Sequence, residues 1–208
     1  PFDVKWEVIF VDDGSTDDTS AIVRERYPGV QVFRYEENRG KGYATKLGMQ
    51  HATGEVRLVS DADGSTPITE IEKFWPEFDN GAAVVIGSRA LPDSAVEVRQ
   101  PWYRQNMGRV YNLMLRMLGL TQFPDTQCGY KAFTAEACEV IFPRQRMNGF
   151  GADAECLYIA KRHNLKIAQV PVRWLNSADT RVHAVFDSLR MIREALTIRL
   201  NTFRRVYD

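Results

Sequence analysis

Two pairs of aspartates stand where apolar runs of the sequence end, and carboxylates in such places could bind a metal ion. Asp61 and Asp63 lie in the stretch "LVSDADGSTP", and Asp12 and Asp13 lie in "VIFVDDGSTDDT". Two carboxylates one residue apart can reach a single Mg²⁺ or Mn²⁺, which prefers oxygen ligands and is usually held by one or two carboxylates plus substrate phosphates. The same residue types also form ordinary turns. The local pattern therefore leaves a turn and a metal site both open.

Basic residues follow these acidic positions and could hold phosphate groups. The segment "ENRGKGYA" places Arg39 and Lys41 among glycines before an expected helix, a setting that suits a nearby phosphate. It has neither the Gly-Lys-Ser/Thr of a P-loop nor Gly-x-Gly-x-x-Gly, so on its own a solvated turn is the more common outcome. Charge-assisted contacts to phosphate favour arginine and lysine. Further candidates of this kind are Arg89, Arg99, Arg104 and Lys131.

Composition limits the classes of function. The chain has 208 residues, of which 44% are hydrophobic, enough to bury a core in one large domain or in a domain with an appendage. Lys plus Arg and Asp plus Glu number 27 each, so any preference for a charged partner must be local, and we expect no nucleic acid. Cys128, Cys138 and Cys156 lack metal-ligand spacing and an even count, which favours buried thiols in a reducing, cytoplasmic compartment.

Alternating apolar and periodic segments predict the elements that would position these residues. We expect helices to follow the predicted strands in turn, a pattern typical of a parallel α/β sheet with right-handed connections. In such a sheet, ligands bind outside the carboxyl ends of the strands, where both aspartate pairs and Arg89 would then gather. The predicted strands of the first half are Glu7–Val11, Val30–Tyr35, Glu55–Ser60 and Ala82–Gly87.

The second half departs from this regular alternation. We expect a strand in "DTQCGYKAF" and a further strand in "LKIAQVPVRW", where Pro171 indicates an edge position because proline has no amide hydrogen for the sheet. No apolar run approaches the roughly 20 residues that a membrane-spanning helix needs. The predicted helices of this half are Trp102–Leu118, Ala135–Phe142 and Ala152–Arg162.

The last segment, residues 185–207, predicts an amphipathic helix. A basic amphipathic helix can lie in an anionic membrane interface, or its apolar stripe can pack on the domain or on a second copy in a homodimer. Sequence alone leaves these alternatives open. The polar face would carry Arg190, Arg193, Asn201 and Arg204, and the apolar face Val185, Leu189, Ile192, Leu196, Leu200, Phe203 and Tyr207.

The chain resembles family 2 glycosyltransferases in a series of motifs that occur in the same order. These motifs are "VDDGSTDDT", "NRGKGYATKLGM", "DADGSTP", "GSR", "DTQCGYKAF" and the basic tail. The likeness is greatest to the dolichyl- or polyprenyl-phosphate β-glucosyltransferases, then to the dolichyl-phosphate mannose synthases. It implies an α/β GT-A fold, the Rossmann-like, mostly parallel sheet of nucleotide-diphospho-sugar transferases, flanked by helices. Residues 1–182 would form the catalytic domain and residues 183–208 the amphipathic helix. The family's first strand has no counterpart in this chain, so we expect a gap in the sheet and in the nucleotide pocket.

The resemblance also implies roles for individual residues. Asp61 and Asp63 match the motif that holds a divalent metal, Mg²⁺ or Mn²⁺, and the donor diphosphate. Asp12 or Asp13 matches an aspartate that contacts the nucleotide, and Gly40 with Lys41 matches a loop on the donor side. Arg89 and Lys131 match cations of the reaction centre. The remaining matches, Arg99, Arg104, Asp153 and Glu155, would bind the acceptor.

The implied activity is an inverting, metal-dependent transfer of a hexose, with glucose from UDP-glucose favoured, to a polyprenyl or dolichyl phosphate. A phosphate monoester, with a second pKa near ~6, needs no general base, whereas a sugar hydroxyl does, and Asp153 is the only obvious candidate. Such an enzyme would work at the cytoplasmic face of a membrane. The alternatives are a family 2 enzyme that uses GDP-mannose or a non-lipid acceptor, and a non-catalytic module that binds nucleotide sugars or docks on membranes.

Overall fold

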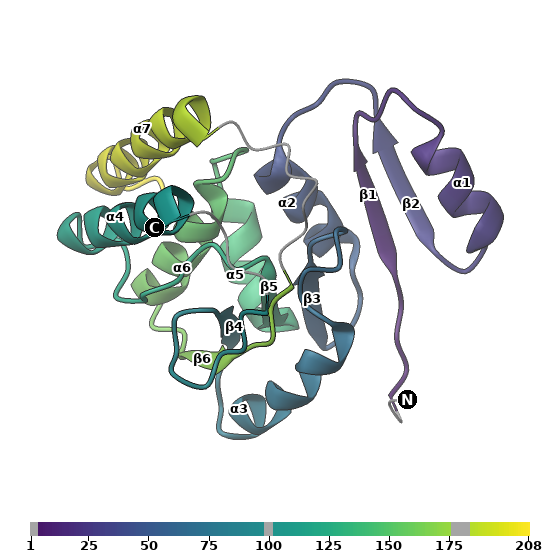
Figure 1. Ribbon diagram of the computed structural model, residues 1–208, viewed down its shortest axis with the longest axis horizontal. Coiled ribbons are helices and arrows are strands. Elements are labelled where there is room, and N and C mark those ends of the chain that lie inside the picture. The colour runs from purple at the N-terminus through teal and green to yellow at the C-terminus, as the bar shows by residue number, and fades with distance from the viewer. Residues whose placement is uncertain (1–3, 98–101, 176–183) are drawn as a thin grey trace.

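The computed structural model describes residues 4–97, 102–175 and 184–208, with side chains from residue 105 in the second range and from residue 188 in the third (Figure 1). The first unit is a two-stranded parallel sheet. Strand β1 (Ile9–Asp13) pairs with β2 (Gln31–Tyr35), and helix α1 (Thr19–Arg26) connects them. Both aspartates of the first pair therefore end a strand, as expected.

The second sheet has the order β3-β5-β4-β6 and is mixed. Strand β4 (Val84–Ser88) runs parallel to β6 (Ile167–Pro171), whereas β5 (Tyr130–Thr134) is antiparallel to both β4 and β3 (Val56–Ser60). The sheet is thus mostly parallel, as the resemblance implied, and β5 is the exception, because it enters the sheet from the opposite end after a long helix and loop. The edge position expected from Pro171 is confirmed, because β6 is the last strand of the sheet.

Helix α2 (Lys41–His51) connects the two sheets. It packs on β1 and also contacts β3, α5 (Ala135–Arg144) and α6 (Ala152–Arg162). Within the described residues, β1 pairs only with β2 and β3 only with β5, so β1 and β3 each have one unpaired edge. The described strands thus form two separate sheets.

Pro67 is followed by a 3₁₀ helix, η1 (Ile68–Lys73), rather than by the expected α-helix. A short helix α3 (Trp75–Asp79) comes next. The buried Glu70 carboxylate accepts a hydrogen bond of 2.9 Å from the Arg173 amide, which ties this segment to the chain beyond β6. The segment that follows Asp61 and Asp63 is therefore fixed to the main sheet.

The main core lies between the four-stranded sheet and the helices α4 (Trp102–Met117), α5, α6 and α7 (Ala184–Phe203). Helices α4 and α7 contact each other and lie side by side on one flank of the molecule (Figure 1). Among the described side chains of α7, Met191, Ala195 and Ile198 enter the core. The stripe residues that face outward are Leu189, Ile192, Leu196, Leu200 and Phe203, and the Val185 side chain lies outside the described residues. Tyr207, predicted on that stripe, is fully buried. No helix in the described ranges is both long and apolar enough to span a membrane.

Candidate active site

Asp12 ends β1 with its carboxylate turned into its own loop. Its Oδ1 atom accepts a hydrogen bond from the Ser15 amide at 2.8 Å, and its Oδ2 atom accepts one from the Ser20 hydroxyl. Burial would raise the pKa of Asp12, but these hydrogen bonds outweigh it and hold the pKa below its ordinary value. Because both oxygens are already engaged and the residue is 2% exposed, we assign Asp12 to the fold rather than to nucleotide contact.

Asp13 fastens the glycine-containing loop to the end of β1. Its carboxylate accepts hydrogen bonds from the backbone amides of Arg39, at 2.7 Å, and Gly40, at 2.9 Å. Gly40 has a φ of 99°, and a Cβ there would lie 2.5 Å from the carbonyl oxygen of Asn148. A left-handed backbone and this close approach both require glycine. Asp13 and Gly40 together set the start of α2, where Lys41 is the first residue.

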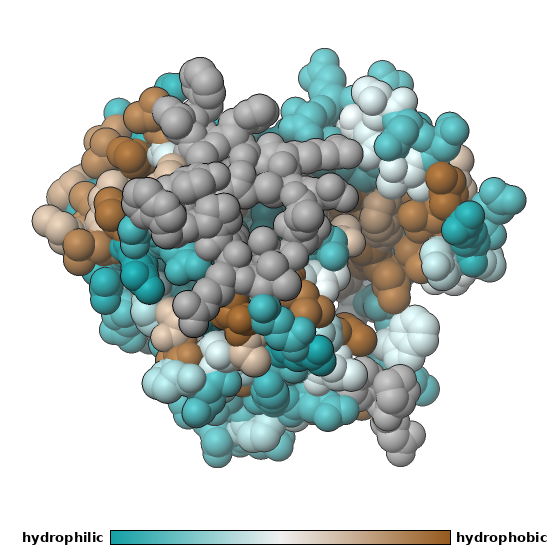
Figure 2. Space-filling view, in the orientation of Figure 1, coloured by the Kyte–Doolittle hydropathy of each residue, from teal (hydrophilic) through white to brown (hydrophobic). Residues whose placement is uncertain are grey.

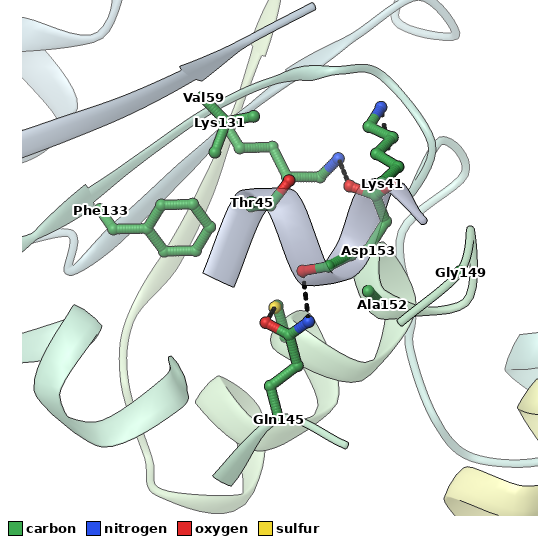
Figure 3. A pocket seen from close by; sticks show the side chains of 11 residues that line it. Lys41, Thr45, Val59, Lys131, Phe133, Gln145, Gly149, Ala152 and Asp153 are labelled. Atoms are coloured by element: carbon green, nitrogen blue, oxygen red, sulfur yellow. Dashed lines mark hydrogen bonds and ion pairs between the residues drawn. The ribbon is translucent and has the colours of Figure 1, made fainter. Parts of the chain in front are cut away.

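Lys41 extends from the start of α2 to the second aspartate pair. Its Nζ lies 2.8 Å from Asp61 Oδ1 and 3.9 Å from Asp153 Oδ2. Lys131 Nζ, on β5, donates a hydrogen bond of 2.6 Å to Asp153 Oδ1. Asp153 thus lies between the two lysines (Figure 3). The structure therefore brings together four of the predicted site residues from β3, α2, β5 and α6.

The alternating charges of this group shift two pKa values. Burial would lower the pKa of Lys41, but Asp153 and Asp61 outweigh it and raise the pKa above its ordinary value. Burial would likewise raise the pKa of Asp153, but Lys131 and Lys41 hold it below its ordinary value. Asp153 is therefore a carboxylate near neutral pH and a weak proton acceptor.

Asp61 lies directly over Gly129, which precedes β5. A Cβ built on Gly129 would be 1.8 Å from Asp61 Oδ2, closer than any real contact. Gly129 is thus the residue of "DTQCGYKAF" that leaves room for the Asp61 carboxylate. No sequence motif marks this contact, because Asp61 follows β3 whereas Gly129 precedes β5, far along the chain.

Asp63 lies in the turn after β3 and is exposed, with Oδ1 accepting a hydrogen bond of 2.9 Å from the Ser65 amide. The described residues contain no group of three or more His, Cys, Asp or Glu that could hold a metal ion. Asp61 and Asp63 supply only hard oxygen donors, which fit a Mg²⁺ or Mn²⁺ ion whose remaining ligands come from substrate phosphates and water. A structural metal enclosed by protein ligands alone does not fit these residues.

Arg89 follows β4 and is held by Asp125, a residue that the sequence analysis missed. The guanidinium Nε and Nη2 atoms donate to the two Asp125 oxygens at 2.8 and 2.9 Å, and the Arg89 amide donates to Asp125 as well. Burial would raise the pKa of Asp125, but Arg89 lowers it to about 2. The Trp174 ring lies 5.3 Å from the guanidinium carbon, which favours a cation–π contact. Only the Nη1 side of Arg89 points away from its carboxylate partner.

A cavity of about 20 Å³ lies behind the Lys131–Asp153 pair, lined also by Val59 and Phe133 (Figure 3). This volume holds about one water molecule. It is far smaller than the several hundred cubic ångströms that bind a small organic ligand. A sugar nucleotide would therefore have to bind on the open side of Asp61 and Asp63.

The predicted acceptor residues differ in their placement. Glu155 is fully buried: it accepts hydrogen bonds from the amides of Arg146, at 2.9 Å, and Met147, at 2.7 Å, and from the Tyr207 hydroxyl at 2.6 Å. It holds a loop and the C-terminal turn, so we assign it to the fold rather than to acceptor binding. Arg99 and the Arg104 side chain lie outside the described residues.

Comparisons with known proteins identify relatives of this chain. A dolichyl-phosphate beta-glucosyltransferase of Trichomonas vaginalis is 35% identical over 185 residues, which is 85% of this chain and 55% of the relative. The human dolichyl-phosphate beta-glucosyltransferase is 32% identical over 209 residues, which is 94% of this chain and 64% of the relative. The chain thus spans between half and two thirds of the length of these relatives.

Solved structures show the same fold. Glucosyl-3-phosphoglycerate synthase from Mycobacterium tuberculosis, in complex with Mn²⁺, uridine diphosphate and glucosyl-3-phosphoglycerate, superposes with a TM-score of 0.67 at 22% identity, covering 92% of this chain and 68% of that one. At this identity the likeness shows a shared architecture. The sequence profile of Glycosyl transferase family 2 matches residues 3–142, about two thirds of the chain. The chain therefore belongs to glycosyl transferase family 2.

Proposed function

We propose that this chain carries the catalytic site of an enzyme that transfers a hexose to a polyprenyl or dolichyl phosphate with inversion. The favoured donor is UDP-glucose: the relatives are named as glucosyltransferases, and a structural neighbour was solved with uridine diphosphate. The observation that carries the proposal is the pairing of the Asp153 carboxylate with two lysines. The one carboxylate that the sequence offered as a general base is paired with Lys131 and Lys41, so it is poorly suited to deprotonate a hydroxyl.

An acceptor that is already an anion removes the need for a base. A phosphate monoester has a second pKa of about 6 and is largely dianionic at neutral pH, so one of its oxygens can attack the sugar directly. The cations of the site suit such an acceptor. Arg89 is oriented by Asp125 with its Nη1 side free of that carboxylate, and we propose that it binds the acceptor phosphate.

Asp61 and Asp63 would hold the divalent ion, Mg²⁺ or Mn²⁺. Such an ion, when bound, supplies positive charge to the departing nucleotide diphosphate. Lys41 adds a second cation next to Asp61 and would contact the same diphosphate as charge develops on it. Gly129 keeps the Asp61 carboxylate in place.

In the reaction, a phosphate oxygen forms the new bond to C1 of the hexose while the bond from C1 to the diphosphate breaks on the opposite face. Attack and departure in line invert the anomeric centre. The electron pair of the broken bond leaves with the nucleotide diphosphate, and no proton needs to move. The residues of this chain hold, orient and neutralise the two phosphate groups.

The proposal is tested with purified protein, UDP-glucose and undecaprenyl phosphate, with and without MnCl₂ or MgCl₂. We expect metal-dependent formation of a glucosylated lipid phosphate, and metal-dependent binding of UDP-glucose measured by calorimetry. The Asp63→Ala variant should lose that donor binding, whereas Asp93→Ala, at an exposed loop position, should keep it. Unchanged donor affinity in Asp63→Ala would contradict the assignment of the metal site.

A panel of nucleotide sugars distinguishes the alternatives. Transfer from GDP-mannose but not from UDP-glucose would replace the proposed donor and leave the site assignment intact. Metal-dependent donor binding without turnover on any lipid phosphate would instead favour a binding module. We also propose that the chain acts at the cytoplasmic face of a membrane, where both the sugar nucleotide and the lipid phosphate are accessible.

A further inference from the structure

Two neighbouring helices expose large apolar side chains on the same flank of the molecule. On α4, Met117 is 81% exposed, and on α7, Phe203 is 72% exposed. Figure 2 shows apolar atoms gathered where Figure 1 places these helices. We call this surface the two-helix face. Its apolar members are Val110, Leu113 and Met117 of α4 and Leu189, Ile192, Leu196, Leu200 and Phe203 of α7.

The outward apolar residues are not those that hold the helices to the domain. Helix α4 packs into the core through Tyr111 and Leu115, and α7 through Met191, Ala195 and Ile198. Each helix therefore has two apolar sides, one buried and one exposed. An exposed apolar surface spread over two adjacent helices is typical of an interaction site.

The two-helix face is also basic. Among the described side chains of α4 and α7, residues 105–117 and 188–203, the only acidic one is Glu194, which turns inward and accepts a hydrogen bond of 2.7 Å from the Gly151 amide. The chain as a whole has a formal net charge of zero, so the positive charge here is local. Arg190 is paired with Glu194 at 3.3 Å, and the other surrounding arginines are Arg109, Arg116, Arg193, Arg199 and Arg204.

This surface adjoins the candidate active site. Gly151, which Glu194 contacts, directly precedes α6, and Asp153 is the second residue of that helix. Gly149 lines the cavity behind the Lys131–Asp153 pair. The loop that α7 supports is thus a wall of the site, so the helix that carries part of the two-helix face also contacts a loop of the site.

We propose that the two-helix face binds the surface of an anionic lipid bilayer. Its apolar side chains enter the boundary between headgroups and acyl chains, and its arginines contact lipid phosphates. The charge argues against a second copy: a two-fold interface places the same surface on both sides, so the arginines would face each other and repel. This proposal rests on the proposed function only where it assumes that the acceptor is a lipid in the membrane. Binding of the chain to a bilayer does not itself require that the chain transfers a sugar.

The test measures sedimentation of the whole chain with phosphatidylcholine vesicles and with vesicles that also contain phosphatidylserine. We expect binding to the anionic vesicles and much less to the neutral ones. Leu113→Glu and Leu196→Glu, one on each helix, should each weaken binding by about tenfold, because each removes one apolar contact and adds a repelled charge. Arg193→Glu should have a similar effect that fades at high salt.

Ile22→Glu on α1 is the matched control, because Ile22 is 45% exposed and lies outside the two-helix face, and its binding should equal that of the unaltered chain. Circular dichroism checks that every variant is folded. Equal binding of Leu196→Glu and Ile22→Glu, or equal binding to both kinds of vesicle, would overturn the proposal. So would a dimer, seen by analytical ultracentrifugation, that Leu196→Glu dissociates without any binding to vesicles.

The same variants separate this proposal from the proposed function. Leu196→Glu should lose transfer to acceptor in vesicles but keep transfer to a short-chain, water-soluble prenyl phosphate. Asp63→Ala should bind vesicles normally while failing to bind donor. If the unaltered chain binds anionic vesicles but glucosylates neither acceptor, the result contradicts the proposed function and still supports the lipid-binding surface.

Discussion

The two acidic strand ends look alike in sequence but differ in the structure. At the end of β1, in the motif "DDGST", Asp12 is buried, with one oxygen bonded to the Ser15 amide of the following loop and the other to the Ser20 hydroxyl of α1. At the end of β3, the motif "DADGST" stays open. The Asp61 side chain is 40% exposed and pairs with Lys41 from another element.

The difference shows what distinguishes a structural carboxylate from one available to a ligand. The hydrogen bonds of Asp12 come from residues within eight positions of it, and Arg34 of β2 adds an ion pair at 3.8 Å, so its charge stabilises the fold around the end of β1. Asp61 is surrounded by groups that tertiary structure brings to it, Lys41 from α2 and Gly129 from before β5. A carboxylate whose partners come from distant segments and leave part of it exposed can exchange those partners for a ligand. The predictions below test this contrast.

The largest effect is expected at the open strand end. Asp61→Ala removes a proposed metal ligand, and donor affinity in the presence of Mn²⁺ should fall by about 100-fold or more, the upper range for disrupting a metal site. Calorimetry with UDP-glucose measures this donor affinity. The free energy of unfolding should change little, because Asp61 is partly exposed. A variant that loses stability rather than donor affinity would show that Asp61 resembles Asp12 after all.

The buried strand end should respond in the opposite way. Asp12→Asn weakens the charged hydrogen bonds from Ser15 and Ser20, and the free energy of unfolding should fall by about 2 kcal/mol. Urea denaturation followed by circular dichroism measures this. Donor affinity at a temperature where the variant is folded should stay close to that of the unaltered chain. A loss of donor affinity without a loss of stability would show instead that Asp12 contacts the nucleotide.

Gly129→Ala tests the position of the Asp61 carboxylate without altering a charge. The new Cβ would overlap the Asp61 carboxylate, which must then rotate away, and donor affinity should fall by about tenfold, the usual scale for a misplaced site residue. Gly108→Ala on α4 is the control, because nothing lies within 4 Å of a Cβ there. It should leave donor affinity unchanged and slightly stabilise the helix.

Much of this architecture followed from sequence periodicity, and the failures have definite causes. Helix α6 has the predicted bounds, and Pro171 correctly marked an edge strand. The direction of β5 was not predictable, because an apolar run looks the same whichever way the chain enters the sheet. Periodicity also grouped Leu189 with Leu196 on one face of α7 but could not say that this face points outward, since the opposite face is apolar too.

In the candidate active site, it was harder to predict which residues contact each other than to predict which residues belong to the site. The resemblance implies acceptor binding by both Asp153 and Glu155, yet residues two apart on a helix do not face the same way. Asp153 therefore reaches the lysines while Glu155 enters the core. Asp125 escaped notice because it contacts Arg89 across 36 residues of sequence, and no local pattern marks such a pair.

The smallest predicted effect is a difference in pH dependence that isolates Asp12. Its pKa in the folded chain lies below the ordinary value, so its contribution to stability is present above the unfolded pKa of about 4 and is lost as pH falls through the folded pKa. The gap in unfolding free energy between the unaltered chain and Asp12→Asn should therefore narrow as pH is lowered below about 4. Urea denaturation of both proteins across that range measures the gap. A gap that stays constant would mean that the serine hydrogen bonds do not favour the ionised carboxylate, and the buried strand end would then need another explanation for its stability.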